Sequence, residues 1–184
     1  AGLLAIGLTT VALQRRTFVH VVEVSPEGQV MSVRSADGRW SPTQTQTAYH
    51  LGRFVRLVRS LPTDGVVLRE NWLEAYRFLT PQAAQRLNEF AREEDPFSLL
   101  GTTARAAVIT SIVQRSDETW QVSWIEATHG ANGGARSSYT GLFTIRFDRP
   151  RNSDALAANP LGLFITEFSF SPEAPAAALR GAQP

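Results

Sequence analysis

Hydrophobic and polar residues follow three successive patterns along the chain. Residues 1–13 are uncharged and mostly apolar, and Gln14-Arg15-Arg16 ends this stretch. Between residues 41 and 95, apolar residues recur every three or four positions, which is the spacing of amphipathic helices. From Thr102 onward, apolar and polar residues alternate, which is typical of half-buried strands. Helices followed by a run of strands predict an α+β fold, with the helices on one face of a curved four-stranded antiparallel sheet.

The apolar start is too short by itself to cross a membrane. A spanning helix needs about 20 apolar residues, whereas a stretch of this length covers only about 20 Å. The only methionine is Met31, so Ala1 is not a natural start and the sequence begins partway through the apolar segment. We therefore interpret residues 1–14 as the C-terminal part of a transmembrane helix. A buried helix or the end of a secretory signal is the alternative, although no Ala-x-Ala cleavage pattern follows. Arg15 and Arg16 favour a cytoplasmic position for this flank, but the positive-inside rule compares both flanks, so the sequence leaves the topology open.

Turn residues divide the rest of the chain. Alternating residues on both sides of Ser25-Pro26-Glu27-Gly28 predict a hairpin, which makes residues 15–40 a juxtamembrane collar. Residues 41–170 contain the helical and alternating patterns and are predicted to form one domain with its own core. Residues 171–184 are rich in proline and alanine and are predicted to form a disordered tail.

Start and stop signals place three helices in this domain. Ser41-Pro42 is predicted to cap the first helix, which closes before Pro62. The second is predicted from Val66 to Leu79, and the third from Thr80-Pro81 to Asp95-Pro96. Trp72, Tyr76 and Phe78 are interpreted as core residues.

Four strands are expected after the helices. They cover residues 103–114, the segment around 120–124, the segment around 139–147, and residues 161–170. Short turns at Ser116-Asp117-Glu118 and Asn132-Gly133-Gly134 predict antiparallel neighbours.

Composition narrows the possible chemistry. The formal net charge is +1, which gives no electrostatic argument for binding nucleic acid or an anionic surface. There are no cysteines, which excludes disulfides, thiolate catalysis and cysteine-based zinc sites. His20, His50 and His129 lack metal-ligand spacing, and neither a phosphate-binding loop nor a serine nucleophile motif is present. We therefore expect no metal, no cofactor and no enzymatic activity.

Two carboxylates are the strongest catalytic candidates. Glu126 ends a tryptophan-rich strand, and Glu167 lies in phase with apolar residues of the last strand. A carboxylate in an apolar pocket would have a raised pKa and could act as a base. An edge-facing charge paired with an arginine such as Arg105 or Arg146 is the favoured interpretation, because no partner acid, histidine or oxyanion donor is identifiable.

Arginines on the first helix are a second candidate site. Arg53, Arg56 and Arg59 recur at helical spacing, opposite the apolar positions. They could contact DNA, but no aromatic stacking platform accompanies them, so a solvated helix face is the preferred interpretation.

The segment Asn159–Ile165 is the third candidate. Asn159-Pro160-Leu161-Gly162 follows a long loop and leads into the last strand. Proline and glycine give this segment an unusual backbone, and the adjacent apolar residues suit protein contact. A turn that only positions the strand explains the segment equally well.

The sequence NPLGLFI, preceded by RFDRPRNSDALAA, resembles the Asn-Pro-x-Gly segment of the bitopic inner-membrane component of type IV secretion systems. The conjugative-transfer branch of that family, the TrbF-like proteins, is the closer match. Three further stretches agree and run in the same order, namely VVEVSPEGQV, YHLGRFVRLVRSLPTDGVVLRENWLEAYRFLT and TWQVSWIEAT.

This resemblance implies a short cytoplasmic N-terminus, a single transmembrane helix in the bacterial inner membrane, and a periplasmic domain with the nuclear-transport-factor-like cone. It also implies a scaffold and assembly factor of the conjugation channel, which associates with itself and with other type IV secretion subunits. Asn159, Pro160 and Gly162 match the family motif and are carried over as protein-interaction residues.

Overall fold

In a computed structural model of the chain, the described residues are 21–24, 30–34, 42–130 and 133–173. The contacts divide the chain into two compact units, Ala1–Ser41 and Pro42–Pro184. In the first unit, β1 (Val21–Val24) and β2 (Val30–Arg34) pair antiparallel, as the hairpin prediction requires. No helix among the described residues is both long and apolar enough to cross a bilayer. The expected membrane segment 1–14 and most of the expected tail lie outside these residues.

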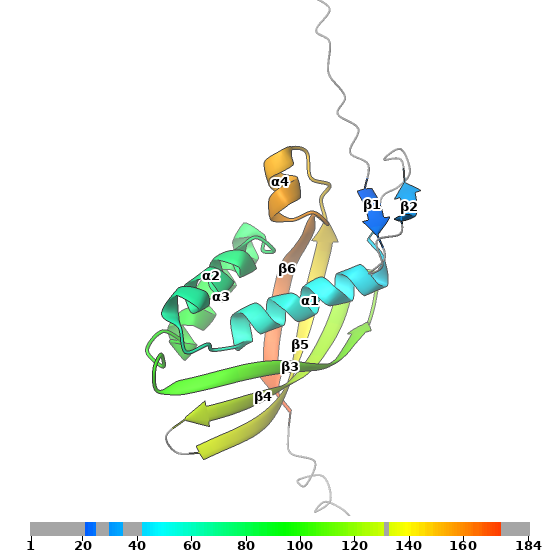
Figure 1. Cartoon of the computed structure of the whole chain (residues 1–184). Helices are drawn as coiled ribbons and strands as arrows, with labels where there is room; N and C mark the ends of the chain where they lie inside the picture. Colours follow the sequence, from blue (N-terminus) through cyan, green and yellow to red (C-terminus); the bar gives the residue numbers. More distant parts are fainter. Residues whose placement is uncertain (1–20, 25–29, 35–41, 131–132, 174–184) are drawn as a thin grey trace, which may run out of the picture. The chain divides into compact units, whose positions relative to one another are not determined.

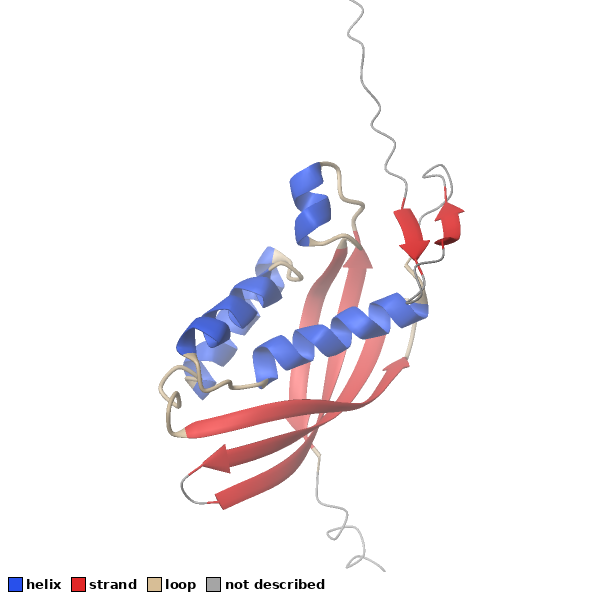
Figure 2. Cartoon of the chain, in the orientation of Figure 1, coloured by secondary structure: helices blue, strands red, loops and turns tan. Residues whose placement is uncertain are grey.

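The second unit is an α+β domain, as the sequence predicts. Its three main helices are α1 (Gln44–Arg59), α2 (Gly65–Tyr76) and α3 (Pro81–Glu94). The four strands are β3 (Thr103–Gln114), β4 (Thr119–Gly130), β5 (Gly133–Phe147) and β6 (Leu163–Pro172). A short helix, α4 (Ser153–Ala158), connects β5 to β6. The strands are antiparallel in the order β3-β4-β5-β6, and the main helices cover one face of the curved sheet (Figures 1 and 2).

Local signals explain where the helices begin and end. Thr80 caps α3 with Pro81 as the first helical residue, and Asp95 ends this helix in the left-handed conformation. The predicted cap of the first helix at Ser41 is wrong, because α1 begins after Thr43. The Thr43 hydroxyl accepts from the Gln46 N–H, and the Gln46 side chain accepts from the Thr43 N–H. This reciprocal capping box satisfies two helix-end donors at once.

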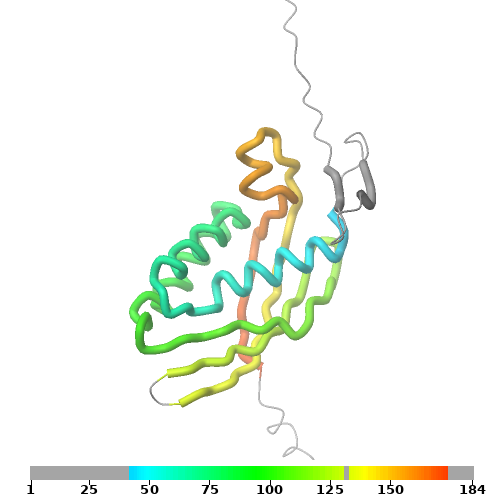
Figure 3. The backbone as a smooth tube through the Cα atoms, viewed as in Figure 1, coloured from blue at the N-terminus to red at the C-terminus, as the bar shows by residue number. Residues whose placement is uncertain are grey.

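The core lies between α1 and the sheet. α1 runs across the strands (Figure 3), and Gly52 allows it to lie close to β3, since a Cβ there would stand 3.2 Å from Ile112 Cδ1. Strand β4 contributes Trp120, Val122 and Trp124, which are buried as their alternation predicts. The predicted core residues Trp72 and Phe78 are also buried, and Tyr76 is half-buried.

The last strand departs from its predicted alternation. Ile145 pairs with Ile165, whereas Thr144 pairs with Glu167, so Thr166 is an additional residue in a β-bulge. The bulge reverses the facing of later residues, so Glu167 is exposed and Phe168 is buried. The prediction that Glu167 shares the buried face of Leu163 and Ile165 is therefore wrong.

Candidate functional site

Asn159 forms the centre of the turn between α4 and β6. Its side-chain Nδ2 donates to the Leu163 carbonyl over 2.7 Å, and its Oδ1 accepts from the Leu163 N–H over 3.2 Å. The same Nδ2 also donates to the carbonyl of Arg77, which follows α2, over 3.4 Å. Since Asn159 is only 4% exposed, these bonds satisfy a buried amide that would otherwise be costly.

Gly162 completes this turn and connects it to the end of β5. Its φ of +54° lies in the left-handed region, where glycine is favoured. A Cβ on Gly162 would stand 1.9 Å from the carbonyl oxygen of Asp148, so only glycine fits without movement of the backbone. The Gly162 N–H donates to the Asn159 carbonyl over 2.9 Å, and its own carbonyl accepts from the Asp148 N–H over 2.8 Å.

The exposed part of this region is formed by α4 and Pro160. No residue of α4 is buried, and Pro160 is exposed next to the buried Asn159. Asn159 and Gly162 therefore build a turn of fixed shape, and that turn presents α4 and Pro160 to solvent. A role for the three motif residues in protein contact remains a prediction.

Glu126 lies in a buried network of charges. Its Oε1 accepts from Arg59 Nε over 2.5 Å and from Trp124 Nε1 over 2.9 Å, while its Oε2 lies 3.6 Å from Arg105. Glu94, near the end of α3, lies 3.5 Å from Arg59 and 3.4 Å from Arg105. The pairing of Glu126 with an arginine such as Arg105 is confirmed, whereas its expected edge-facing position is wrong, because Glu126 is only 3% exposed. Two hydrogen bonds and the neighbouring Arg105 thus hold this carboxylate within a buried ion-pair network.

The prediction that Arg59 lies on a solvated face of α1 is wrong. Its side chain is 2% exposed and lies over the rings of Phe90, Tyr139 and Phe170, with centroid distances of 5.0–5.5 Å. Aromatic faces and a carboxylate together stabilise a buried guanidinium. The sequence contains a signal for the burial of Arg59, because position 59 is four residues after Val55 and therefore lies at the edge of the apolar face.

The other two arginines do not form a continuous basic surface with Arg59. Arg53 Nε is paired with Glu74 Oε1 over 2.5 Å, and Arg56 is exposed. The arrangement gives no support to DNA binding through this helix.

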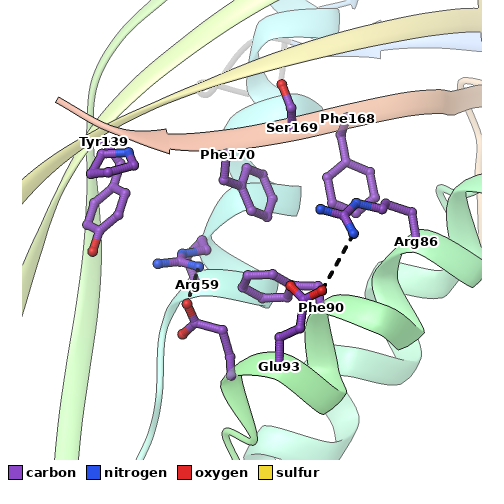
Figure 4. A pocket seen from close by; sticks show the side chains of 10 residues that line it. Arg59, Arg86, Phe90, Glu93, Tyr139, Phe168, Ser169 and Phe170 are labelled. Atoms are coloured by element: carbon purple, nitrogen blue, oxygen red, sulfur yellow. Dashed lines mark ion pairs between the residues drawn. The ribbon is translucent and has the colours of Figure 1, made fainter.

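A small pocket opens between α3 and β6 (Figure 4), with a volume of about 210 Å³. It is lined by residues that include Arg59, Arg86, Phe90, Tyr139 and Phe170. The pocket is smaller than the 300–1,000 Å³ usual for small-molecule sites, and neither Glu126 nor Glu167 lines it. The alternative of a pocket enzyme that uses one of these carboxylates therefore has no geometric support.

The histidines lie apart from this pocket. Within the described ranges, no group of three His, Asp or Glu side chains is arranged to hold a metal ion. His50 packs against Phe78, and its Nδ1 has no hydrogen-bond partner among the described residues. Burial, and next the positive charge of Arg53, lower the pKa of His50, while Glu74 acts in the opposite direction. His129 is exposed, and His20 lies outside the described residues.

The family model described as VirB8 protein matches residues 1–173. The conjugal transfer protein TrbF of Rhizobium radiobacter is 28% identical over 125 residues, which are 66% of this chain and 57% of that protein. This chain thus spans little more than half the length of that relative.

Solved structures resemble the fold of this chain. A TrwG component of a type IV secretion system from Bartonella birtlesii superposes with a TM-score of 0.64 and 18% identity, covering 73% of this chain and 96% of that one. The VirB8 protein of Agrobacterium tumefaciens gives a TM-score of 0.62 at 15% identity, covering 74% and 99%. At these identities the likeness shows the fold, which is the expected cone with helices on a curved antiparallel sheet.

Proposed function

From the premise that this chain belongs to the VirB8 family, we propose that it is a scaffold and assembly factor in the inner-membrane part of a conjugative type IV secretion system. In this role it makes no covalent change in a substrate. It associates with itself and holds other subunits of the inner membrane and periplasm in place. The family match along residues 1–173 is the observation that carries the proposal.

Anchoring follows from the same premise. Residues 1–14 form the end of a single transmembrane helix, and the unit Pro42–Pro184 lies in the periplasm. Anchored copies share a thin layer beside the membrane, so weak contacts between them are sufficient for assembly.

The contact surface that we assign to other subunits is α4 together with Pro160. This segment is exposed, and Asn159 and Gly162 hold it in one conformation. A rigid surface loses little conformational entropy on binding, which suits a scaffold. In this account Asn159 and Gly162 act through the shape of the turn, and Pro160 and α4 make the contact.

Photo-crosslinking in conjugating cells tests this assignment. A photoreactive amino acid at Pro160 is expected to give crosslinks to other subunits of the machine, whereas the same residue at Gln85, exposed on α3, serves as the matched control. If Pro160 gives no crosslink beyond the Gln85 control while the machine is assembled, the assigned surface is wrong. If cells lacking this protein still conjugate normally, the scaffold role is wrong.

A further inference from the structure

The outer face of the sheet, which points away from the helices, has three ordered rows of side chains. Val108 on β3 pairs with Ile125 on β4, and both point outward. Two residues back along β4, toward its start, the outward row contains hydroxyls, Ser123 and its β5 partner Thr140. Two residues further back, the row contains Val113 and Leu142, which lie on either side of Gln121. We call these three rows the outer-face patch.

The two outer rows of the patch carry apolar side chains, and none of the residues named in its three rows is charged. Val108, Val113 and Leu142 are 55%, 41% and 47% exposed. A charge lies at the edge, where the Arg115 guanidinium donates to Gln121 Oε1 over 2.7 Å. Scattered exposed apolar residues are common on any protein. Depletion of charge together with aligned apolar rows is instead typical of the centre of a protein interface.

A partner can bury the hydroxyl row with little loss of hydration free energy. The Ser123 and Thr140 hydroxyls lie 3.3 Å apart, and Thr140 Oγ1 donates to the Val122 carbonyl over 3.4 Å. These hydroxyls keep partners within the sheet when water is removed, so burying them leaves few unsatisfied groups.

We propose that the outer-face patch pairs with the same patch of a second copy, which deepens the self-association in the proposed function and rests on it. In a symmetric pair of facing sheets, the two-fold axis lies in the interface, either along the strands or across them. With the axis at Ser123, both orientations place the hydroxyl row on the hydroxyl row of the other copy and apolar rows on apolar rows. A second copy thus supplies the apolar–hydroxyl–apolar order of the patch, and Arg115 stays bonded to Gln121 of its own copy at the edge.

The size of the patch predicts a weak contact. Three strands about 4.8 Å apart and three rows about 7 Å apart cover roughly 300 Å². This is below the roughly 800 Å² per partner of a stable complex, so the pair should have a dissociation constant of micromolar or weaker in dilute solution. Copies confined by a membrane anchor are concentrated enough to populate such a pair.

Because the chain has no cysteine, a single introduced thiol reports on this contact without background. Facing sheets pack about 10 Å apart, which is too far for a disulfide but within reach of a short bis-maleimide crosslinker. Ser123→Cys in the full-length protein in host membranes is expected to give a crosslinked dimer. Gln85→Cys, on the exposed side of α3, is the matched control and should give at least tenfold less dimer.

A second variant tests the apolar rows. Leu142→Arg, at a position already half exposed, should leave the melting temperature of the domain unchanged within about 2 °C. Combined with Ser123→Cys, it should reduce the crosslinked fraction at least tenfold, because it places a charge in the interface of both copies.

Co-purification of two differently tagged copies separates the possible failures. If tagged copies co-purify but Ser123→Cys does not crosslink, or if Leu142→Arg leaves the crosslink intact, this face is not the contact and self-association stands. If tagged copies do not co-purify at all, both this inference and the self-association in the proposed function are wrong.

Discussion

Replacement of Gly162 by alanine should destabilise the domain far more than the same change at another glycine with positive φ. Gly162 and Gly101 have φ angles of +54° and +77°, so an alanine at either position carries a conformational cost of about 1–2 kcal/mol. The two sites differ in the room that they leave for a Cβ. A Cβ on Gly101 meets no described atom within 4 Å, whereas a Cβ on Gly162 would stand 1.9 Å from the Asp148 carbonyl oxygen and 2.8 Å from its carbon.

The additional cost at Gly162 follows from this overlap. Relief of the overlap requires the Asp148 backbone to move by more than 1 Å relative to Gly162, since ordinary contact begins at 3.4 Å. That movement breaks the bond from the Asp148 N–H to the Gly162 carbonyl, worth about 0.5–1.5 kcal/mol, and adds packing strain of about 1–3 kcal/mol. Gly162→Ala should therefore cost about 2.5–6.5 kcal/mol in total, about 1.5–4.5 kcal/mol more than Gly101→Ala.

Urea unfolding of the unit Pro42–Pro184, followed by circular dichroism, measures both costs by linear extrapolation. The comparison holds when the two variants have the same dependence of unfolding free energy on urea. Equal losses of unfolding free energy for the two variants would refute the reasoning, because the turn would then accept a side chain at Gly162 without displacing Asp148.

Two further predictions concern buried ionisable groups. Glu126→Gln should lower the unfolding free energy by about 3–5 kcal/mol, because it leaves Arg59 buried without its carboxylate, whereas Arg53→Met breaks a partly exposed ion pair and should cost less than about 1 kcal/mol. Similar losses for the two variants in urea unfolding would contradict the burial of this network. The pKa of His50 is lowered in the folded state, so the unfolded state binds the proton more readily and stability should fall as the pH drops below the ordinary value of 6.5. Melting temperatures at about pH 7.5 and about pH 5.5 should show a smaller decrease in His50→Gln than in the unmodified chain, and an equal decrease would exclude His50 as its source.

Local chemistry made much of this fold predictable. The strand 103–114 has the bounds expected from its pattern, and Thr80-Pro81 starts a helix because a threonine cap and a proline at the first position are both satisfied locally. In β4, strict alternation places Trp120, Val122 and Trp124 in the core without reference to any distant residue. In these segments the deciding interactions lie within a few residues, although the cap of α1, which is also local, lies at Thr43 and not at the predicted Ser41.

The wrong predictions for Glu167 and Arg59 share a different cause. The facing of Glu167 depends on a bulge between β5 and β6, and a single additional residue reverses the facing of every later side chain. The burial of Arg59 depends on Glu126, which lies 67 residues further along the chain, and on rings from α3, β5 and β6. Helical spacing alone places a charged residue on the exposed side, because it contains no information about a distant partner.

By itself, the sequence determined the order of helices and strands, the absence of cysteine chemistry, and the motif that resembles the conjugative branch of the type IV secretion family. Only the tertiary structure decided that Asn159 and Gly162 build the turn from within, that Glu126 is held by arginines, and that the outer-face patch forms three aligned rows. The physical reason is that caps, periodicity and turns are short-range, whereas strand register and buried charge pairs depend on residues that only the fold brings together.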